Sequence, residues 1–222
     1  MRFIFKSLAI IAMSVTVLAS VPHTTKAAAF VIEDNDDGFT VAFPDSWAKV
    51  QNQKSDDKLT IAGPGENNLA SCRVRVRDDK RFMIYPSQKF ADDIQKVGFS
   101  KEFWQNYLGE YDDVEIDAFR DGAGLGRGHA SMIETSYTTA EGTIAKKRGM
   151  MFATLYGNRV YIVDCSSEET FYDKWRPDFL GIIKSVDFKK VDHENLNGNY
   201  RDFQDDKDVV IQNGKKQEVY RF

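Results

Sequence analysis

The pattern of apolar and polar positions is clearest in residues 148–188, where it predicts a hairpin followed by a helix. Residues 150–155 and 159–165 are apolar runs rich in β-favouring side chains, and a short segment containing Gly157 and Asn158 separates them. A Gly-Asn pair at this place favours a tight turn because both residues accept positive φ angles. We therefore expect two adjacent antiparallel strands here.

An amphipathic helix is expected directly after this hairpin. Ser166, followed three residues later by Glu169, has the pattern of a capping box at a helix N-terminus. The apolar positions at helical spacing are Phe171, Trp175 and Phe179, widened by Leu180, Ile182 and Ile183. A stripe of this width predicts that the helix covers one face of the sheet to which the hairpin belongs.

Shorter segments elsewhere predict further strands and a helical region. The expected strands are residues 38–43, 47–50, 58–62, 72–77, 114–118 and 129–137. Residues 87–108 read as helical, with a break at Gly98 and with Ser100 as the cap of a second segment.

Two segments resemble ligand loops only superficially. The acidic cluster at residues 33–37 would need an acidic twelfth calcium ligand where Pro44 stands, so we expect a solvated lead-in instead. The glycine-rich residues 121–128 lack both the full dinucleotide fingerprint and the Gly-Lys-Ser/Thr of a phosphate loop. A flexible turn between two strands is therefore expected there.

The N-terminus has the pattern of a signal peptide. Arg2 and Lys6 precede an uncharged, mostly apolar run at residues 8–21, and small residues follow at 25–29. A membrane anchor needs about 20 apolar residues, and this run is shorter and interrupted by polar side chains. We expect cleavage after residues 1–27, with an uncleaved anchor as the alternative. The mature protein is then soluble, exported to the periplasm or the cell exterior, and without stable membrane insertion.

The mature chain is expected to contain one domain and a tail. Residues 28–189 carry the predicted strands and helices, whereas residues 190–222 are polar. In this tail, Asn213-Gly214 separates two short apolar runs, so the tail is a candidate for a small β-hairpin. A two-stranded hairpin alone is marginally stable in water, so it either docks on the domain or stays mobile.

Charge excludes one class of partner, and the cysteines suggest a crosslink. Removing the three basic residues of the signal leaves 27 of the 30 basic residues against 34 acidic ones, which disfavours nucleic-acid binding. Cys72 and Cys165 each share a strand side with apolar residues, so both point toward an apolar face. In an exported chain this favours a disulfide, with two buried free thiols as the alternative.

Three arginines form the one candidate ligand site in the sequence. Because Cys72 and its alternating apolar neighbours occupy one side of their strand, Arg73, Arg75 and Arg77 share the other side. A row of guanidinium groups can bind carboxylates or phosphates. The alternative is a solvated sheet face whose arginines pair with acidic neighbours.

Catalytic, metal and cofactor residues are not predicted. His23 belongs to the signal, His193 lies in the polar tail, and His129 heads a predicted strand. The sequence contains no nucleophile elbow, no His-Glu-x-x-His pair and no spaced Cys/His set. A small secreted hydrolase that uses His129 is kept as an alternative.

As a pattern, the chain resembles the PsbP-like family, whose fold is shared by photosystem accessory proteins and Mog-type Ran-binding proteins. The resemblance rests on GFTVAFPDSW at residues 38–47 and on the hairpin and helix that end in IIKSVDF at residues 182–188. It covers about residues 37–189. The resemblance implies an α+β fold, a central antiparallel sheet flanked by helices in an α/β/α sandwich.

The resemblance also implies a binding or assembly-accessory role without catalysis. The expected partner is an unidentified protein or a small anionic ligand, and no cofactor is expected. The photosystem and Ran functions do not carry over, because no residue match supports them. A structural or host-facing interaction protein is a further alternative.

Overall fold

The computed structural model describes residues 28–52, 54–65, 69–79, 98–139 and 144–190, together with the backbone of residues 209–213 and 216–220. The predicted signal peptide (1–27), the first predicted helical segment (87–97) and residues 191–208 of the tail lie outside the described residues. Within the described part, no helix has both the length and the apolar composition needed to cross a membrane.

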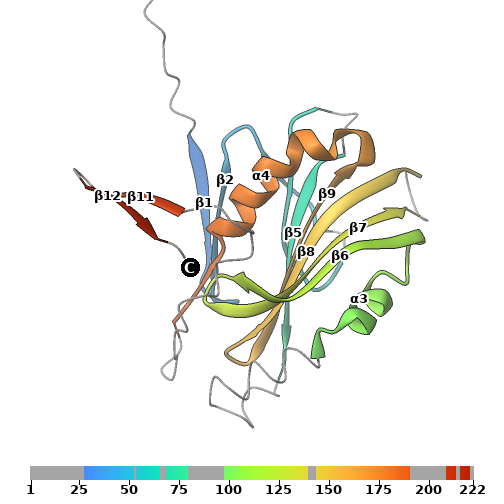
Figure 1. The fold of residues 1–222 in the computed structure, drawn as a ribbon, viewed down its shortest axis with the longest axis horizontal. Helices are drawn as coiled ribbons and strands as arrows, with labels where there is room; N and C mark the ends of the chain where they lie inside the picture. Colours follow the sequence, from blue (N-terminus) through green and yellow to red (C-terminus); the bar gives the residue numbers. More distant parts are fainter. Residues whose placement is uncertain are drawn as a thin grey trace, which may run out of the picture.

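A sheet of seven antiparallel strands forms the centre of the molecule (Figure 1). In spatial order its strands are β3 (Ala48–Val50), β4 (Asp57–Ala62), β5 (Ser71–Asp78), β9 (Arg159–Glu168), β8 (Lys146–Tyr156), β7 (Gly128–Thr138) and β6 (Asp112–Leu125). The predicted hairpin is β8 and β9, joined by Gly157 and Asn158. Gly157 has a φ angle of 58°, a conformation that glycine adopts without steric cost.

A second sheet of three strands contains β1 (Ala29–Asp34), β2 (Phe39–Pro44) and β10 (Asp187–Phe188), with β2 in the middle. Residues 33–37 are exposed or half-buried, as expected of a solvated segment, but they are no lead-in, because β1 includes the first two of them and the others form the β1–β2 turn. Asp34 Oδ1 accepts hydrogen bonds from the backbone amides of Asp36 and Asp37, which closes this turn.

The chain beyond the main domain contains one further pair of strands in its described backbone. β11 (Val209–Asn213) and β12 (Lys216–Tyr220) pair antiparallel, as the apolar runs on either side of Asn213-Gly214 predicted.

The helix after the hairpin begins later than its capping-box pattern predicted. β9 continues to Glu168, a short 3₁₀ turn η1 (Glu169–Phe171) follows, and α4 (Tyr172–Ser185) begins after it. Ser166 is not a cap, because it pairs in register with Ser71 on β5 and Gly149 on β8. The ladder on both sides of β9 thus holds the segment in the extended conformation.

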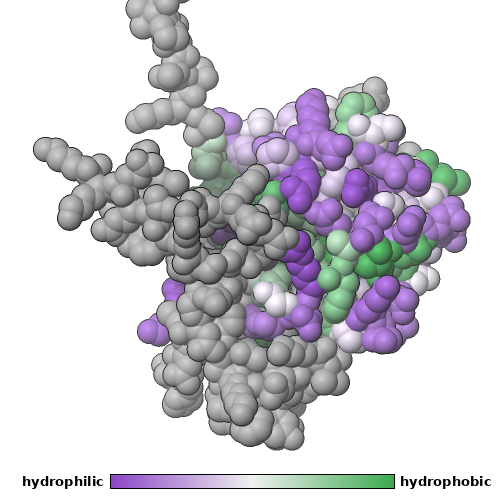
Figure 2. Space-filling model, in the orientation of Figure 1, coloured by the Kyte–Doolittle hydropathy of each residue, from purple (hydrophilic) through white to green (hydrophobic). Residues whose placement is uncertain are grey.

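This shift changes which aromatic residues of the helix are buried. Tyr172, Trp175 and Phe179 are buried, whereas Phe171 is 37% exposed, so its predicted place in the packed stripe is wrong. The outer side of α4 is mainly hydrophilic and carries the exposed residues Asp173 and Lys174 (Figure 2). The helix is therefore amphipathic, as predicted. Because it begins at Tyr172, its apolar side starts with Tyr172 and not with Phe171.

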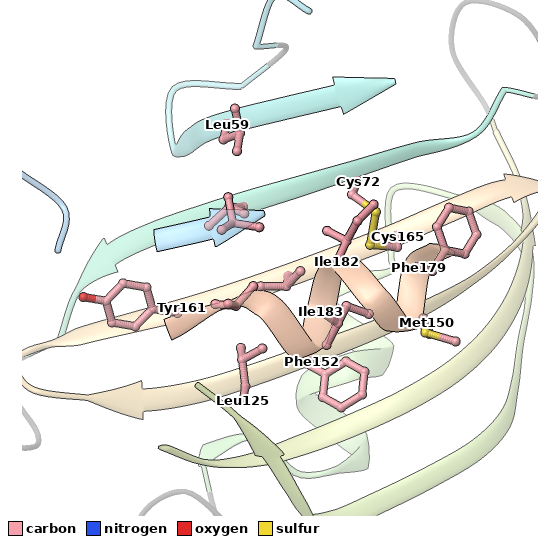
Figure 3. Packing of buried hydrophobic residues seen from close by; sticks show 14 of the residues in the cluster. Leu59, Cys72, Leu125, Met150, Phe152, Tyr161, Cys165, Phe179, Ile182 and Ile183 are labelled. Atoms are coloured by element: carbon pink, nitrogen blue, oxygen red, sulfur yellow. A yellow bond between two sulfur atoms is a disulfide. The ribbon is translucent and has the colours of Figure 1, made fainter. Parts of the chain in front are cut away.

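The larger core lies between α4, the three-stranded sheet and one face of the main sheet. Phe179, Ile182 and Ile183 of α4 extend toward that face, which also presents Phe152 (Figure 3). The Cys72–Cys165 disulfide lies within this core and joins β5 to β9, with the two Cα atoms 4.0 Å apart.

The opposite face of the main sheet is covered in its described part by α3 (Lys101–Tyr107). Trp104 is fully buried there, and its indole nitrogen donates a hydrogen bond of 2.9 Å to Ser131 Oγ on β7. Ser100 precedes the helix as predicted, although its hydroxyl donates to Glu102 rather than capping a backbone amide. The α+β class with a central antiparallel sheet is confirmed. The helix-flanked α/β/α sandwich is not confirmed, because the described part consists mostly of β-strands and contains only the helices α3 and α4.

The glycine-rich segment belongs mostly to a strand rather than to a flexible turn. β6 continues to Leu125, and only Gly126 and Arg127 turn the chain into β7. The pairing of Ala123 with Ala130 and of Leu125 with Gly128 holds the segment in register. Gly126 is required because its φ angle is 56° and a Cβ atom would lie 2.8 Å from the Phe188 ring.

Candidate functional site

The arginine row lies on the α3 side of β5, opposite the disulfide, as strand alternation predicted. Each of its guanidinium groups meets an aspartate from a neighbouring segment. The pairs are Arg73–Asp164 at 2.5 Å, Arg75–Asp57 at 2.7 Å and Arg77–Asp56 at 2.6 Å. Asp164 lies on β9 and Asp57 on β4, so two of the pairs join β5 to both of its neighbours.

Burial separates the first two pairs from the third. Arg75 is 2% exposed and Arg73 9% exposed, whereas Arg77 is exposed at the end of β5. Burial disfavours the charged form of Arg73, but the adjacent Asp164 carboxylate outweighs this effect, so the pKa of Arg73 lies above its usual value. Two of the three arginines are thus buried cations, each neutralised by an aspartate on a neighbouring strand.

Tyrosine hydroxyl groups add one hydrogen bond to each of the two buried arginines. Tyr107 accepts a hydrogen bond of 2.7 Å from Arg75 Nη1, and the guanidinium carbon lies 5.3 Å from the Tyr107 ring centre. Tyr111 accepts a hydrogen bond of 3.3 Å from Arg73 Nη2. Burial raises the pKa of both hydroxyl groups above the usual range, so both remain protonated at neutral pH.

Asp164 is the centre of this buried polar network. Besides its ion pair with Arg73, its negative charge adds to the effect of burial in raising the pKa of Tyr137 on β7 and acts in the same direction on Lys147 on β8. Burial lowers the pKa of Lys147, and the negative charge of Asp164 opposes that shift. Asp164 Oδ1 and Arg75 Nη2 are both buried without a hydrogen-bond partner. Perturbed groups gathered in this way occur at functional sites and also in structural ion-pair networks.

The geometry of the row favours a structural role for its inner part. A carboxylate or phosphate ligand would have to displace Asp164 or Asp57 from guanidinium groups that are almost inaccessible to solvent. Binding of an anionic ligand by the row stays a prediction, and Arg77 is the member that solvent can reach.

A cleft lies where the β1–β2 turn and the β8–β9 turn come together. This end of the main sheet is opposite to the end at which α4 begins. The volume of the cleft is about 650 Å³, and it is open to solvent. Four chain segments line it, and their described residues are Asn35, Asp36, Gly38, Asp78, Tyr156, Gly157, Asn158, Arg159, Tyr161, Lys189 and Lys190. This volume falls within the range of about 300–1,000 Å³ that is usual for small-molecule sites.

Hydrogen bonds between distant segments fix the walls of the cleft. The Tyr161 hydroxyl donates to the Asp37 carbonyl at 2.9 Å, and the Lys189 amide donates to the Gly38 carbonyl at 2.8 Å. On the other wall, the Asp79 amide donates to the Asn158 carbonyl at 2.7 Å. Hydrogen bonds of the fold itself therefore hold the segments that line the cleft.

Two of the lining residues, Tyr156 and Tyr161, belong to a stack of aromatic rings. The Tyr161 and Tyr156 rings stack on Phe188 of β10, with centroid distances of 4.1 and 5.3 Å. Both tyrosines are about 95% buried, so they expose little surface to the cleft. The exposed lining combines polar and charged groups with apolar surface.

Sequence patterns did not identify the cleft residues as a group. Gly38, Gly157 and Asn158 were recognised only as turn or strand-boundary residues. Lys189 was recognised only as the end of the domain, and Lys190 only as the start of the polar tail. A turn that carries an arginine directly after it, as Asn158-Arg159 does, is a local signal that could have been used. It would not have shown which other turn lies beside it.

His129 lies away from this cleft. It is not among the described residues that line it, and His129 Nε2 lies 2.6 Å from the Asp121 carbonyl oxygen at the β6–β7 hairpin. Among the described residues, no group of three or more histidine, cysteine, aspartate or glutamate side chains is arranged to hold a metal ion.

The sequence matches no known protein-family model, and it matches no curated protein. Among solved structures, the chain is similar in fold to cyanobacterial PsbP (CyanoP) from Synechocystis sp. PCC 6803, with 14% identity and a TM-score of 0.49 over 77% of this chain and 98% of that one. It is also similar to LpqN of Mycobacterium tuberculosis, a protein involved in cell envelope biogenesis, with 11% identity and a TM-score of 0.46 over 73% of this chain and 91% of that one. At these values the similarity assigns no role to any residue.

Proposed function

We propose that the mature chain is an exported binding or assembly-accessory protein without catalytic activity, and that the cleft between the β1–β2 and β8–β9 turns is its binding site. Residues 28–189 are the functional unit in this proposal. The ligand is a small molecule, or a side chain or short segment of a partner protein, that fits a cleft of about 650 Å³.

The observation that carries the proposal is the convergence of four chain segments on one open cleft. Backbone hydrogen bonds hold these segments together without help from a ligand. A preformed site loses little conformational freedom on binding, and sites of this kind favour affinity for that reason. Surface loops supported by a rigid sheet are also the usual location of binding residues.

The disulfide supports the exported part of the proposal. The Cys72–Cys165 crosslink belongs to the class of bonds that persist in oxidising compartments and are rare in the cytosol. The basic, apolar and small-residue regions of residues 1–27 are the corresponding targeting signal.

Site-specific photo-crosslinking tests the proposal in the cells that make the protein. A photoreactive side chain is introduced at Asn158, which is exposed in the cleft, and in a second variant at Asn106, which is exposed on α3. The full chain with its signal is expressed, irradiated and analysed by intact mass. This measurement detects an added small molecule as well as an added protein.

We expect an adduct of defined mass at Asn158 and none at Asn106. An adduct at Asn106 alone would contradict the cleft and direct attention to the arginine row beneath α3. Absence of any adduct at Asn158 would also contradict the proposal.

A further inference from the structure

The charges around Gly38 indicate what kind of chemical group the cleft accepts. Gly38 has a φ angle of 69° and no side chain, so its backbone is accessible at the cleft. The position that a Cβ atom would occupy lies 3.7 Å from Arg159 Nη1 and 3.6 Å from the Tyr161 hydroxyl oxygen. A ligand atom next to Gly38 would therefore contact the Arg159 guanidinium directly.

Arg159 lies at the cleft, where it hydrogen-bonds the Tyr161 side chain and is paired only loosely with an acidic group. Its ion pair with Asp78 has a separation of 3.8 Å, and the Asp78 side chain is 89% exposed. A pair at this distance with one partner in solvent contributes little, so a ligand can replace it at small cost. The buried pairs of Arg73 and Arg75 on the same sheet differ from it in both distance and burial.

Two lysines extend the positive charge along the cleft. Lys189 and Lys190 follow β10 and are exposed, and they form no ion pair with any described residue. Asp37 of the β1–β2 turn is already paired with Lys58 at 3.1 Å. The carboxylates of Asp36 and Asp78 remain at the rim, where they repel a ligand that carries many negative charges.

We propose that the cleft binds a small ligand through one acidic group, a carboxylate or a phosphate, that lies beside Gly38 and pairs with Arg159, with Lys189 and Lys190 as outer cations. The inference rests on the proposed function, because it assigns a ligand class to the same cleft. The planar guanidinium suits both groups, since each presents two oxygens in the geometry of its paired donors. The rim carboxylates exclude polyanions.

Nuclear magnetic resonance titration of the ¹⁵N-labelled mature chain tests this ligand class. Inorganic phosphate and acetate are the two probes, each added at an ionic strength kept constant with sodium chloride. We expect saturable shifts of the Gly38, Asn158 and Lys189 amide signals. Saturation by phosphate alone identifies a phosphate-bearing ligand, and saturation by acetate alone identifies a carboxylate.

Substitutions connect the shifts to the proposed cations. Arg159→Gln should weaken the binding of the probe at least tenfold, and Lys189→Gln/Lys190→Gln should weaken it less. Lys49→Gln removes one charge from exposed β3, outside the cleft, and should leave binding unchanged. If Arg159→Gln disturbs the whole spectrum, the double lysine variant provides the comparison.

Shifts that do not saturate, or that are equal in Arg159→Gln and the unsubstituted chain, would overturn the inference. An adduct at Asn158 without any response to either anion would overturn the inference alone and leave the proposed function standing. Absence of both the Asn158 adduct and the response to the anions would contradict the proposed function and this inference together.

Discussion

Arg73 on β5 and Asp164 on β9 face each other in register, and Arg73 Nη2 lies 2.5 Å from Asp164 Oδ2 beneath the α3 layer. The carboxylate is 1% exposed and the arginine 9% exposed, so the pair is withdrawn from water. Each charge depends on the other, because an unpaired charge at this depth would have no solvent to stabilise it.

Substituting one partner should destabilise the protein strongly. We expect Asp164→Ala to lower the free energy of unfolding by about 3–5 kcal/mol, because it leaves the Arg73 cation buried and unpaired. Arg73→Met/Asp164→Leu removes both charges and should cost about 2 kcal/mol less than the single change. Urea unfolding of the three proteins measures the difference. A double variant less stable than Asp164→Ala would contradict this account of the pair.

The disulfide should contribute a large part of the stability. Its cysteines are 93 residues apart in sequence, so Cys72→Ala/Cys165→Ala should lower the free energy of unfolding by about 2–5 kcal/mol. Added reductant should have a similar effect on the unsubstituted chain and none on the double variant. A reductant effect that persists in the double variant would show that the loss has another origin.

Two aromatic residues four positions apart at the start of the helix should differ sharply. Trp175 is 6% exposed and lies edge-on to Trp47, with ring centroids 5.6 Å apart, whereas Phe171 is 37% exposed. Trp175→Ala should cost about 3–5 kcal/mol of unfolding free energy. Phe171→Ala, the matched control, should cost about 0.5 kcal/mol or less, as surface substitutions usually do. Equal losses in urea unfolding would contradict the observed start of α4.

Lys147 gives the buried network a pH dependence with a definite sign. Because its folded pKa is below the ordinary value of 10.5, the unfolded chain holds the lysine proton more tightly than the folded one. This penalty is fully present at pH 7 and disappears as the pH rises through the folded pKa toward 10.5. Lys147→Met should therefore stabilise the protein at pH 7 and give a smaller advantage at pH 10. An advantage that grows with pH would contradict the lowered pKa.

Elements defined by local patterns were predictable from the sequence. The β8–β9 hairpin followed from two apolar runs and Gly157, and the alternation in β5 placed Cys72 and Arg73 on opposite faces. Ser166 shows the limit of such reasoning. A serine followed by a glutamate three residues later has the same pattern at a helix cap and in a strand whose backbone is paired on both sides.

The arginine pairs and the cleft depend on contacts that no local pattern contains. The partner of Arg73 was not identified, although Asp164 between the apolar residues Val163 and Cys165 is a signal that a buried charge needs a counterion. The cleft could not be predicted because its walls come from segments more than one hundred residues apart, as the Tyr161–Asp37 hydrogen bond illustrates. These turns come together only because the three-stranded sheet packs beside the seven-stranded sheet in the folded chain.

The measurement that tests the central claim most directly is affinity capture of the mature protein from its native compartment, with a variant whose cleft is filled. Asn158→Trp places an indole at the cleft, and Asn106→Trp adds the same bulk on exposed α3. The account predicts that the unsubstituted chain and Asn106→Trp retain the same ligand or partner, and that Asn158→Trp retains at least tenfold less while unfolding at the same urea concentration. Equal retention by all three proteins would contradict the assignment of the cleft as the binding site.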